Sequence, residues 1–203
     1  MTIRRGEPWG EQVESPDDLP VVENDAAARA VLLSHLELGT RPLQMGLAGG
    51  DLAHTLGGGA AGRFPGQVVR APIDVLRVEA DGQTTWAVAH VVARGWWWRG
   101  EVVLAMNAQF LGKYDVAPRS HPNDGRVDML HIDPRMGVRT RLAVRRRARR
   151  GNHLPHPLID ARQTPGATER FVRPLTIRVD GVRWLRTREL TVTVEPDALI
   201  AHA

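Results

Sequence analysis

Two Asp-Gly pairs, each standing between runs of alternating residues, limit what this chain can fold into more than any other feature. Asp81-Gly82 precedes an alternating run over residues 84–92, and Asp180-Gly181 separates such runs over residues 175–179 and 182–185. Asp-Gly is favoured in the two-residue type I′ turn, whose twist matches that of paired antiparallel strands. The sequence therefore predicts β-hairpins at both places. Because both faces of residues 84–92 are largely apolar, this strand is expected to be central in its sheet.

Two stretches have helical patterns. Apolar residues recur at helical spacing over residues 26–37, and Asn24 or Asp25 can cap the start of this helix. A second helix is expected to begin at an Asp133 cap and to end at Gly151. Since the remaining elements are short strands bounded by turn residues, the sequence predicts a mainly β, α+β fold.

The composition argues against several classes of function. The chain has 203 residues and no cysteine, which excludes disulfides, thiolate metal sites and a cysteine nucleophile. Lys113 is the only lysine and does not lie in a P-loop pattern. No apolar run approaches the roughly 20 residues that span a bilayer, and the N-terminus lacks the apolar segment of a secretory signal. A cytoplasmic location is therefore expected.

Two loops contain residue types that bind ligands. Gly49-Gly50-Asp51 stands between an expected strand and an expected helix, an arrangement whose backbone N–H groups can cradle phosphate. Asn107 ends an apolar strand, and Asn123-Asp124-Gly125 turns the chain into another strand over residues 127–132. From local chemistry alone, the same residues are also consistent with a flexible connector and ordinary turns.

Together these segments resemble bacterial diacylglycerol kinases and their lipid-kinase relatives. The family carries an Asn and a Gly-rich loop, then an A-P pair and a D-G-x-L-D motif. The matching residues here are Asn107, Gly112, Ala117, Pro118, Asp124, Gly125 and Asp128. Three shorter matches follow in the order of the family: G-x-H…H-P at residues 151–157, V-D-G at residues 179–181 and P-x-A-L at residues 196–199.

The chain also departs from the family pattern. The family's glycine loop reads P-x-G-T-x-N-D-x-A-R-x-L-G, and this chain keeps Asp51, Ala53, Leu56 and Gly57 of it. Gly50 stands in place of the Asn, His54 in place of the Arg, and Val182 in place of the Glu in V-D-G-E. The family's G-G-D-G-T nucleotide motif does not occur in the sequence.

The resemblance implies a β-sandwich like the second domain of these kinases over residues 66–203, with a few flanking helices. Residues 1–65 would be a reduced N-terminal part that contains the first helix and the glycine loop. The implied activity is Mg²⁺-assisted transfer of phosphate from ATP to a lipid hydroxyl. Because the nucleotide motif is absent, we expect this activity to be degenerate, or to need a second copy of the chain or a separate nucleotide-domain partner.

The resemblance also implies roles for particular residues. Asp124 would be the catalytic base, and Asp128 would support it or hold the metal ion. The residues that would line the nucleotide side are Gly49, Gly50, Asp51, Asn107 and Gly112.

A non-catalytic module that binds lipid, membrane or protein is the alternative. Trp96–Trp98 cannot all point into one core, so at least one indole is expected at the surface. The arginines within Arg145–Arg150 could attract anionic headgroups and hold the protein at the periphery of a membrane. Both features also have structural interpretations, as core packing and as a solvated helix face. Nucleic acid is not expected as a partner, because no recognition motif accompanies the arginines.

A metal-dependent hydrolase built on His153 and His156 is a more distant alternative. Pro155 opposes a regular helix through this pair, and neither a carboxylate nor a third histidine is adjacent. A structural role for the two histidines is therefore favoured.

Overall fold

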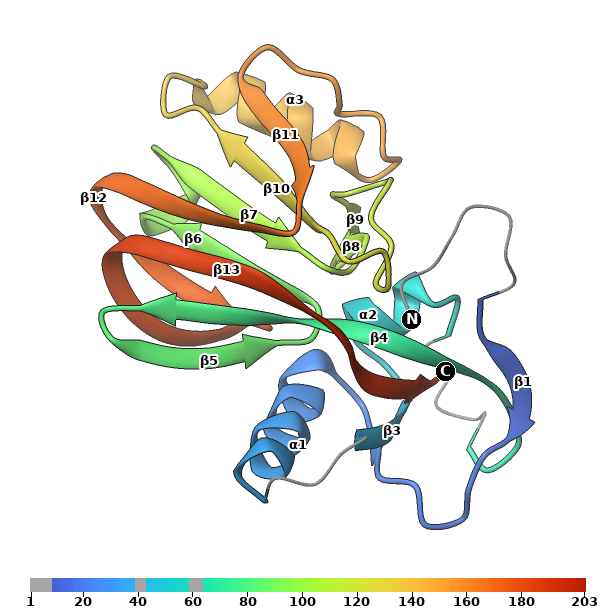
Figure 1. Ribbon diagram of the computed structural model, residues 1–203. Coiled ribbons are helices and arrows are strands. Elements are labelled where there is room, and N and C mark those ends of the chain that lie inside the picture. Colours follow the sequence, from blue (N-terminus) through green and yellow to red (C-terminus); the bar gives the residue numbers. More distant parts are fainter. Residues whose placement is uncertain (1–8, 39–42, 59–63) are drawn as a thin grey trace.

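A large, mostly antiparallel sheet dominates the computed structural model, which describes residues 9–38, 43–58 and 64–203 (Figure 1). Along its main path the strands follow the order β1-β4-β13-β12-β6-β7-β10-β11. Three further strands join it: β5 pairs with β4, and β3 pairs in parallel with both β13 and β2. The strands of this sheet are β1 (Glu11–Glu14), β2 (Val21–Val22), β3 (Leu43–Leu47), β4 (Gln67–Ala80), β5 (Gln83–Ala87), β6 (His90–Arg94), β7 (Val102–Met106), β10 (Val127–Ile132), β11 (Ile159–Thr164), β12 (Gly166–Val179) and β13 (Val182–His202).

The helices lie outside this sheet. The helical elements are α1 (Asp25–Leu38), α2 (Asp51–Thr55), α3 (Val138–Ala148) and the 3₁₀ turn η2 (Trp96–Trp98). A small separate hairpin pairs β8 (Phe110–Leu111) with β9 (Tyr114–Asp115). α3 lies above β7 and β10, with β11 drawn in front of it, whereas α1 and α2 lie on the side of β3 and β4 (Figure 1). The prediction of a mainly β, α+β fold is confirmed.

Both predicted Asp-Gly hairpins are present. Asp81 and Gly82 have φ angles of 47° and 74°, and Asp180 and Gly181 have φ angles of 48° and 80°. A type I′ turn requires positive φ at both central residues, which aspartate tolerates and glycine adopts freely. The first turn connects β4 to β5, and the second connects β12 to β13.

The strand expected over residues 84–92 is divided in two. β5 ends at Ala87 and pairs with β4, while β6 begins at His90 and lies between β12 and β7. The cause is the Asp180 carboxylate, which accepts hydrogen bonds from the N–H groups of Val88, Ala89 and His90. These N–H groups therefore bond to a side chain instead of to a neighbouring strand, which interrupts the predicted strand. Of its two pieces, only β6 is central in the sheet as predicted.

The first helix agrees with the prediction over residues 26–37. The N–H of Ala27 donates to Asn24 Oδ1 at 2.9 Å, so Asn24 is the capping residue. The expected end at Gly39 lies outside the described residues.

The second helix begins later than predicted. Asp133 closes a turn instead, in which its carbonyl accepts from Met136 N–H and its carboxylate accepts from Arg135 N–H. Met136 is only 3% exposed, and burying this side chain places a turn between Asp133 and the helix. α3 consequently starts at Val138, with Gly137 as its N-cap. The chain leaves it through Gly151, which has a positive φ of 66° as expected.

Three groups of buried apolar side chains fill the molecule. One lies between the strands of the curled sheet, because inward residues of β4, β12 and β13 pack with those of β6, β7 and β10. A second lies between α1, α2, β3 and the adjoining parts of β4 and β13. The third covers the outer face of β6, β7 and β10 and packs under α3 and the loops that flank it. Among the described residues, no helix combines the length and apolar character needed to cross a bilayer.

The predicted division at residues 65 and 66 stays a prediction. β3, from the proposed N-terminal part, pairs in parallel with β13 near the end of the chain. The two parts thus contribute strands to one sheet.

Candidate functional site

The glycine loop lies between β3 and α2 and packs closely on the chain that enters α1. A Cβ atom added at Gly49 would lie 2.4 Å from the carbonyl oxygen of Glu23. At Gly50, where φ is 100°, it would lie 2.5 Å from Oδ1 of Asp25. The two glycines are therefore required by an approach of the protein's own backbone and side chains.

The N-terminus of α2 is already capped by a carboxylate. Asp25 Oδ2 accepts a hydrogen bond from Asp51 N–H at 2.7 Å, and Oδ1 accepts one from Leu52 N–H at 3.1 Å. Asp25 is 9% exposed, and burial raises its pKa, against the lowering effect of these two bonds. The position where a phosphate would accept backbone N–H groups is thus taken by a side chain of the same chain.

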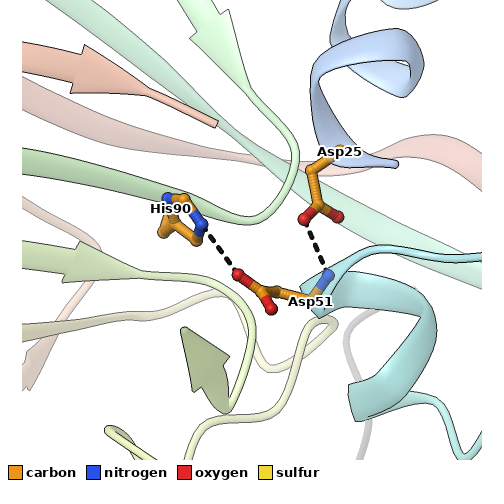
Figure 2. A group of neighbouring side chains, drawn as sticks. All are labelled: Asp25, Asp51 and His90. Atoms are coloured by element: carbon orange, nitrogen blue, oxygen red, sulfur yellow. Dashed lines mark hydrogen bonds and ion pairs between the residues drawn. The ribbon is translucent and has the colours of Figure 1, made fainter. Parts of the chain in front are cut away.

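Asp51 pairs with a buried histidine (Figure 2). Its Oδ2 lies 3.0 Å from His90 Nε2, and its Oδ1 accepts the N–H of Gly112 at 2.8 Å. Burial alone would lower the pKa of His90, but the hydrogen bond with Asp51 and the charges of Asp180, Asp51 and Asp25 raise it above its ordinary value. The carboxylates around His90 thus favour its charged form.

Asp180 anchors the backbone beside this pair. It is 4% exposed, and burial raises its pKa to about 6. From the sequence, Asp180 was predicted as a hairpin turn residue and as part of the V-D-G match, Asp25 only as a possible helix cap, and His90 had no predicted role. No spacing in the chain links residues 25, 51, 90 and 180, so only the fold brings them together.

Asp25, Asp51 and His90 each offer one possible metal-ligand atom, and these three atoms lie within 4.8 Å of one another. Mg²⁺ prefers an octahedron of oxygen atoms and several retained waters. Here one of the donors is an imidazole, and both oxygens of each carboxylate already hold hydrogen bonds within the protein. The cluster therefore does not fit the Mg²⁺ ion that the resemblance implies.

Asp124 and Asp128 belong to a second network. Asp124 lies in the turn before β10, where its Oδ1 accepts Arg126 N–H. Burial, together with the charges of Asp128 and Asp74, raises its pKa to about 6, against the lowering effect of the Arg126 N–H bond. Asp128 accepts a hydrogen bond from Gln163 Nε2 at 3.2 Å, and burial raises its pKa.

Asp74 is the centre of this second network. It is fully buried and accepts hydrogen bonds from Gly125 N–H, Asn123 Nδ2 and Asp197 N–H. Its own N–H donates to the carbonyl of Pro122. The turn that carries Asp124 is thus fixed to β4 by Asp74.

Asn107 lies between the two networks. It is fully buried, and its Nδ2 donates to the carbonyls of Asp74 and Val88, each at 2.8 Å. Its amide therefore ties the end of β7 to β4 and to the break between β5 and β6. Of the residues predicted for the nucleotide side, the structure gathers Gly49, Gly50, Asp51 and Gly112 around the glycine loop, and Asn107 links this loop region to the network of Asp124 and Asp128.

A cavity of about 1140 Å³ lies between α3 and the outer face of the sheet. Its floor is apolar, with Leu104, Leu130 and Ile159 among its residues. On the α3 side it is lined by Val138 and Leu142, which are 51% and 59% exposed.

The mouth of the cavity carries aromatic and cationic side chains. Trp96 and Trp98 line it and are 82% and 39% exposed, so the expectation of an indole at the surface is confirmed. Arg141 holds α3 to η2, because it donates to the carbonyls of Met136, Trp98 and Gly100. The sequence predicted Trp96–Trp98 and the arginines within Arg145–Arg150 as a binding surface, but not the cavity that Trp96, Trp98 and Arg145 line.

The two histidines after α3 have separate environments. His153 is 4% exposed and lines the cavity, and burial lowers its pKa. His156 Nδ1 accepts the N–H of Leu158 at 3.1 Å. Within the described parts of the chain, neither belongs to a cluster of three possible metal ligands.

Comparison with known proteins identifies the fold. No family model and no curated protein matches this sequence. A solved structure from Bacillus anthracis str. Sterne, provisionally assigned as a diacylglycerol kinase, aligns with a TM-score of 0.64 and 14% identity over 91% of this chain and 77% of that one. A structure of a diacylglycerol kinase from the same organism aligns with a TM-score of 0.60 and 14% identity over 91% and 75% of the two chains.

The chain has a diacylglycerol-kinase-like fold. An identity of 14% shows the fold alone. Since 91% of this chain is aligned, the likeness is not confined to residues 66–203.

Proposed function

We propose that this protein binds a lipid, whose apolar part lies in the cavity between α3 and the sheet. The observation that carries the proposal is the cavity itself, because its volume of about 1140 Å³ suits a molecule of lipid size. Contact between an acyl chain and the apolar floor would stabilise the complex by about 25 cal/mol for each Å² of apolar surface removed from water.

The exposed apolar residues at the mouth support the same proposal. Trp96, Val138 and Leu142 are each more than half exposed, and all three line the cavity. Large apolar side chains gathered at an opening indicate an interaction site, whereas single ones scattered over a surface do not. A bound chain would cover them.

We expect Leu142→Asp to weaken lipid binding by about tenfold or more, since it removes an apolar contact and places a charge at the mouth. The measurement is a fluorescence titration with a fatty acid that carries an environment-sensitive dye. Val172→Asp is the matched control, because Val172 is 85% exposed and lies on β12, outside the cavity lining. Equal affinities for the two variants would contradict the proposal.

Phosphoryl transfer is the activity that the resemblance implies, with Asp124 as base, Asp128 at the metal and ATP at the glycine loop. We propose that this activity is weak in the isolated chain or depends on a partner. Two observations support this: no G-G-D-G-T motif occurs in the sequence, and Asp25 caps the helix that would receive phosphate. Membrane contact, a homodimer and a separate nucleotide-domain partner stay predictions.

Incubation of the purified chain with ATP, Mg²⁺ and diacylglycerol or sphingosine should therefore give little or no phosphorylated lipid. Radiolabelled ATP and separation of the lipid products would measure it. Asp124→Asn serves as the control for trace activity. Robust turnover by the wild-type chain, abolished in Asp124→Asn, would refute the proposal that the isolated chain has weak activity. It would also show that the protein is an active lipid kinase.

A further inference from the structure

Arg94 ends β6 on the sheet face that α3 covers, and its side chain lines the cavity. Register places it opposite Val102 on β7 and Thr176 on β12. Two residues earlier on the same face, Val92 packs in the apolar group under α3. The guanidinium therefore projects beside an apolar floor.

The polar contacts of Arg94 within the protein are incomplete. One terminal nitrogen donates to the carbonyl of Gly95 at 3.3 Å, and the guanidinium lies over the ring of Trp98 at 4.8 Å. Its Nε is buried and has no hydrogen-bond partner. Leaving a buried donor of a charged group unpaired is costly, and the protein's own groups therefore do not satisfy this guanidinium.

The charges around Arg94 also leave it uncompensated. Burial and the nearby charge of Arg178 both lower its pKa. None of the ion pairs among the described residues includes Arg94. A partly buried cation whose charged neighbour is another cation would be stabilised by an anion.

The other arginines of the cavity do not share this property. Arg141 is occupied by main-chain carbonyls, Arg145 donates to the hydroxyl of Tyr114, and Arg99 is exposed to water. Arg94 is thus the cavity arginine that is partly buried and yet lacks an anionic partner among the described residues, so an acceptor from a ligand could bind it.

We infer that the ligand is an anionic amphiphile, whose acidic head is bound by Arg94 and whose chain extends over the apolar floor. A carboxylate or a phosphate accepts N–H bonds from a guanidinium, often two in parallel. This inference rests on the proposed lipid binding and adds the chemical class of the lipid and the residue that selects it. A fatty acid and a phosphorylated lipid share this chemistry.

The test compares three ten-carbon probes: decanoate, decyl phosphate and uncharged decanol. Isothermal titration at pH 7.5 should show that the wild-type protein binds both anions more tightly than decanol. Arg94→Met removes the guanidinium but keeps an apolar side chain of similar length, and it should weaken binding of the anions by about ten- to a hundredfold. Binding of decanol should change by less than about twofold, so that the preference for anions disappears. The tighter of the two anions identifies the head group.

Arg178→Met is the matched control, because it removes a nearby positive charge that does not line the cavity. It should leave the preference for anions unchanged. Arg94→Lys keeps the positive charge but lacks the paired N–H donors of a guanidinium, so it should retain part of the preference for anions. A partial preference in this variant would show that the loss in Arg94→Met comes from the missing charge and not from a folding defect.

Three results would overturn the inference. If Arg94→Met binds all three probes as the wild type does, or loses all three equally, Arg94 does not bind the head although the cavity binds lipid. If the wild-type protein binds decanol as tightly as the anions, the ligand is not anionic. If it binds none of the probes, the proposed function fails with the inference.

Discussion

Asp180→Ala should lower the free energy of unfolding by about 3 kcal/mol or more. The Asp180 carboxylate is 4% exposed and accepts three backbone N–H groups, those of Val88, Ala89 and His90, at 2.9, 2.9 and 3.0 Å. Each buried donor that loses its acceptor costs about 1–3 kcal/mol, because nothing replaces the lost bond. Urea unfolding followed by tryptophan fluorescence would measure the change.

Asp81→Ala is a closely matched control. Asp81 occupies the same position of the same turn type, with φ of 47° against 48° for Asp180, so the strain of an alanine is equal in both. Asp81 is exposed, and its Oδ1 accepts one hydroxyl, that of Thr187. We expect a loss of about 1–2 kcal/mol here. If the two substitutions cost the same, the division between β5 and β6 does not depend on the Asp180 carboxylate.

The pH dependence of stability gives a second readout of the same substitution. Burial raises the pKa of Asp180 from 3.8 to about 6 in the folded protein. The folded state then binds this proton more tightly than the unfolded state, so the contribution of Asp180 to stability falls as the pH rises from about 4 to about 6. The stability curve of Asp180→Ala should lack this decline relative to that of the wild type.

The hairpins could be predicted because their signals are local. Asp-Gly at residues 81–82 and 180–181 has one favoured conformation, and alternation on either side supplies the strands. The cap of α1 by Asn24 is equally local, since donor and acceptor lie three residues apart. The order of short motifs then indicated the kinase-like fold, although no single motif is specific.

The candidate site could not be predicted in the same way. Asp25 is the first residue of α1, and its sequence position suggests a cap for that helix. Its carboxylate caps α2 instead, 26 residues away, because the glycine loop approaches so closely. The cavity was missed for a related reason: α3 has a strongly basic sequence, and only its position over the sheet shows that Val138 and Leu142 face an opening.

Gly49→Ala distinguishes the two interpretations of the glycine loop. If the glycines serve only to let a phosphate approach, an alanine would leave the stability of the unliganded protein nearly unchanged. The structure predicts otherwise, because the added Cβ would lie 2.4 Å from the main-chain oxygen of Glu23. A backbone atom cannot move aside as a flexible side chain can, so we expect a loss of about 1–3 kcal/mol from overpacking.

Gly137→Ala is the control for this substitution. A Cβ at Gly137 would meet no atom within 4 Å, and its φ of −67° suits alanine. That change should alter the free energy of unfolding by less than about 1 kcal/mol, because the restriction of the unfolded chain by alanine offsets its poorer fit at the N-cap of α3. Urea unfolding of both variants gives the comparison. Should Gly49→Ala unfold at the same urea concentration as Gly137→Ala, the close approach of Gly49 to Glu23 would not exist, and the protein's own backbone would not require a glycine at this position.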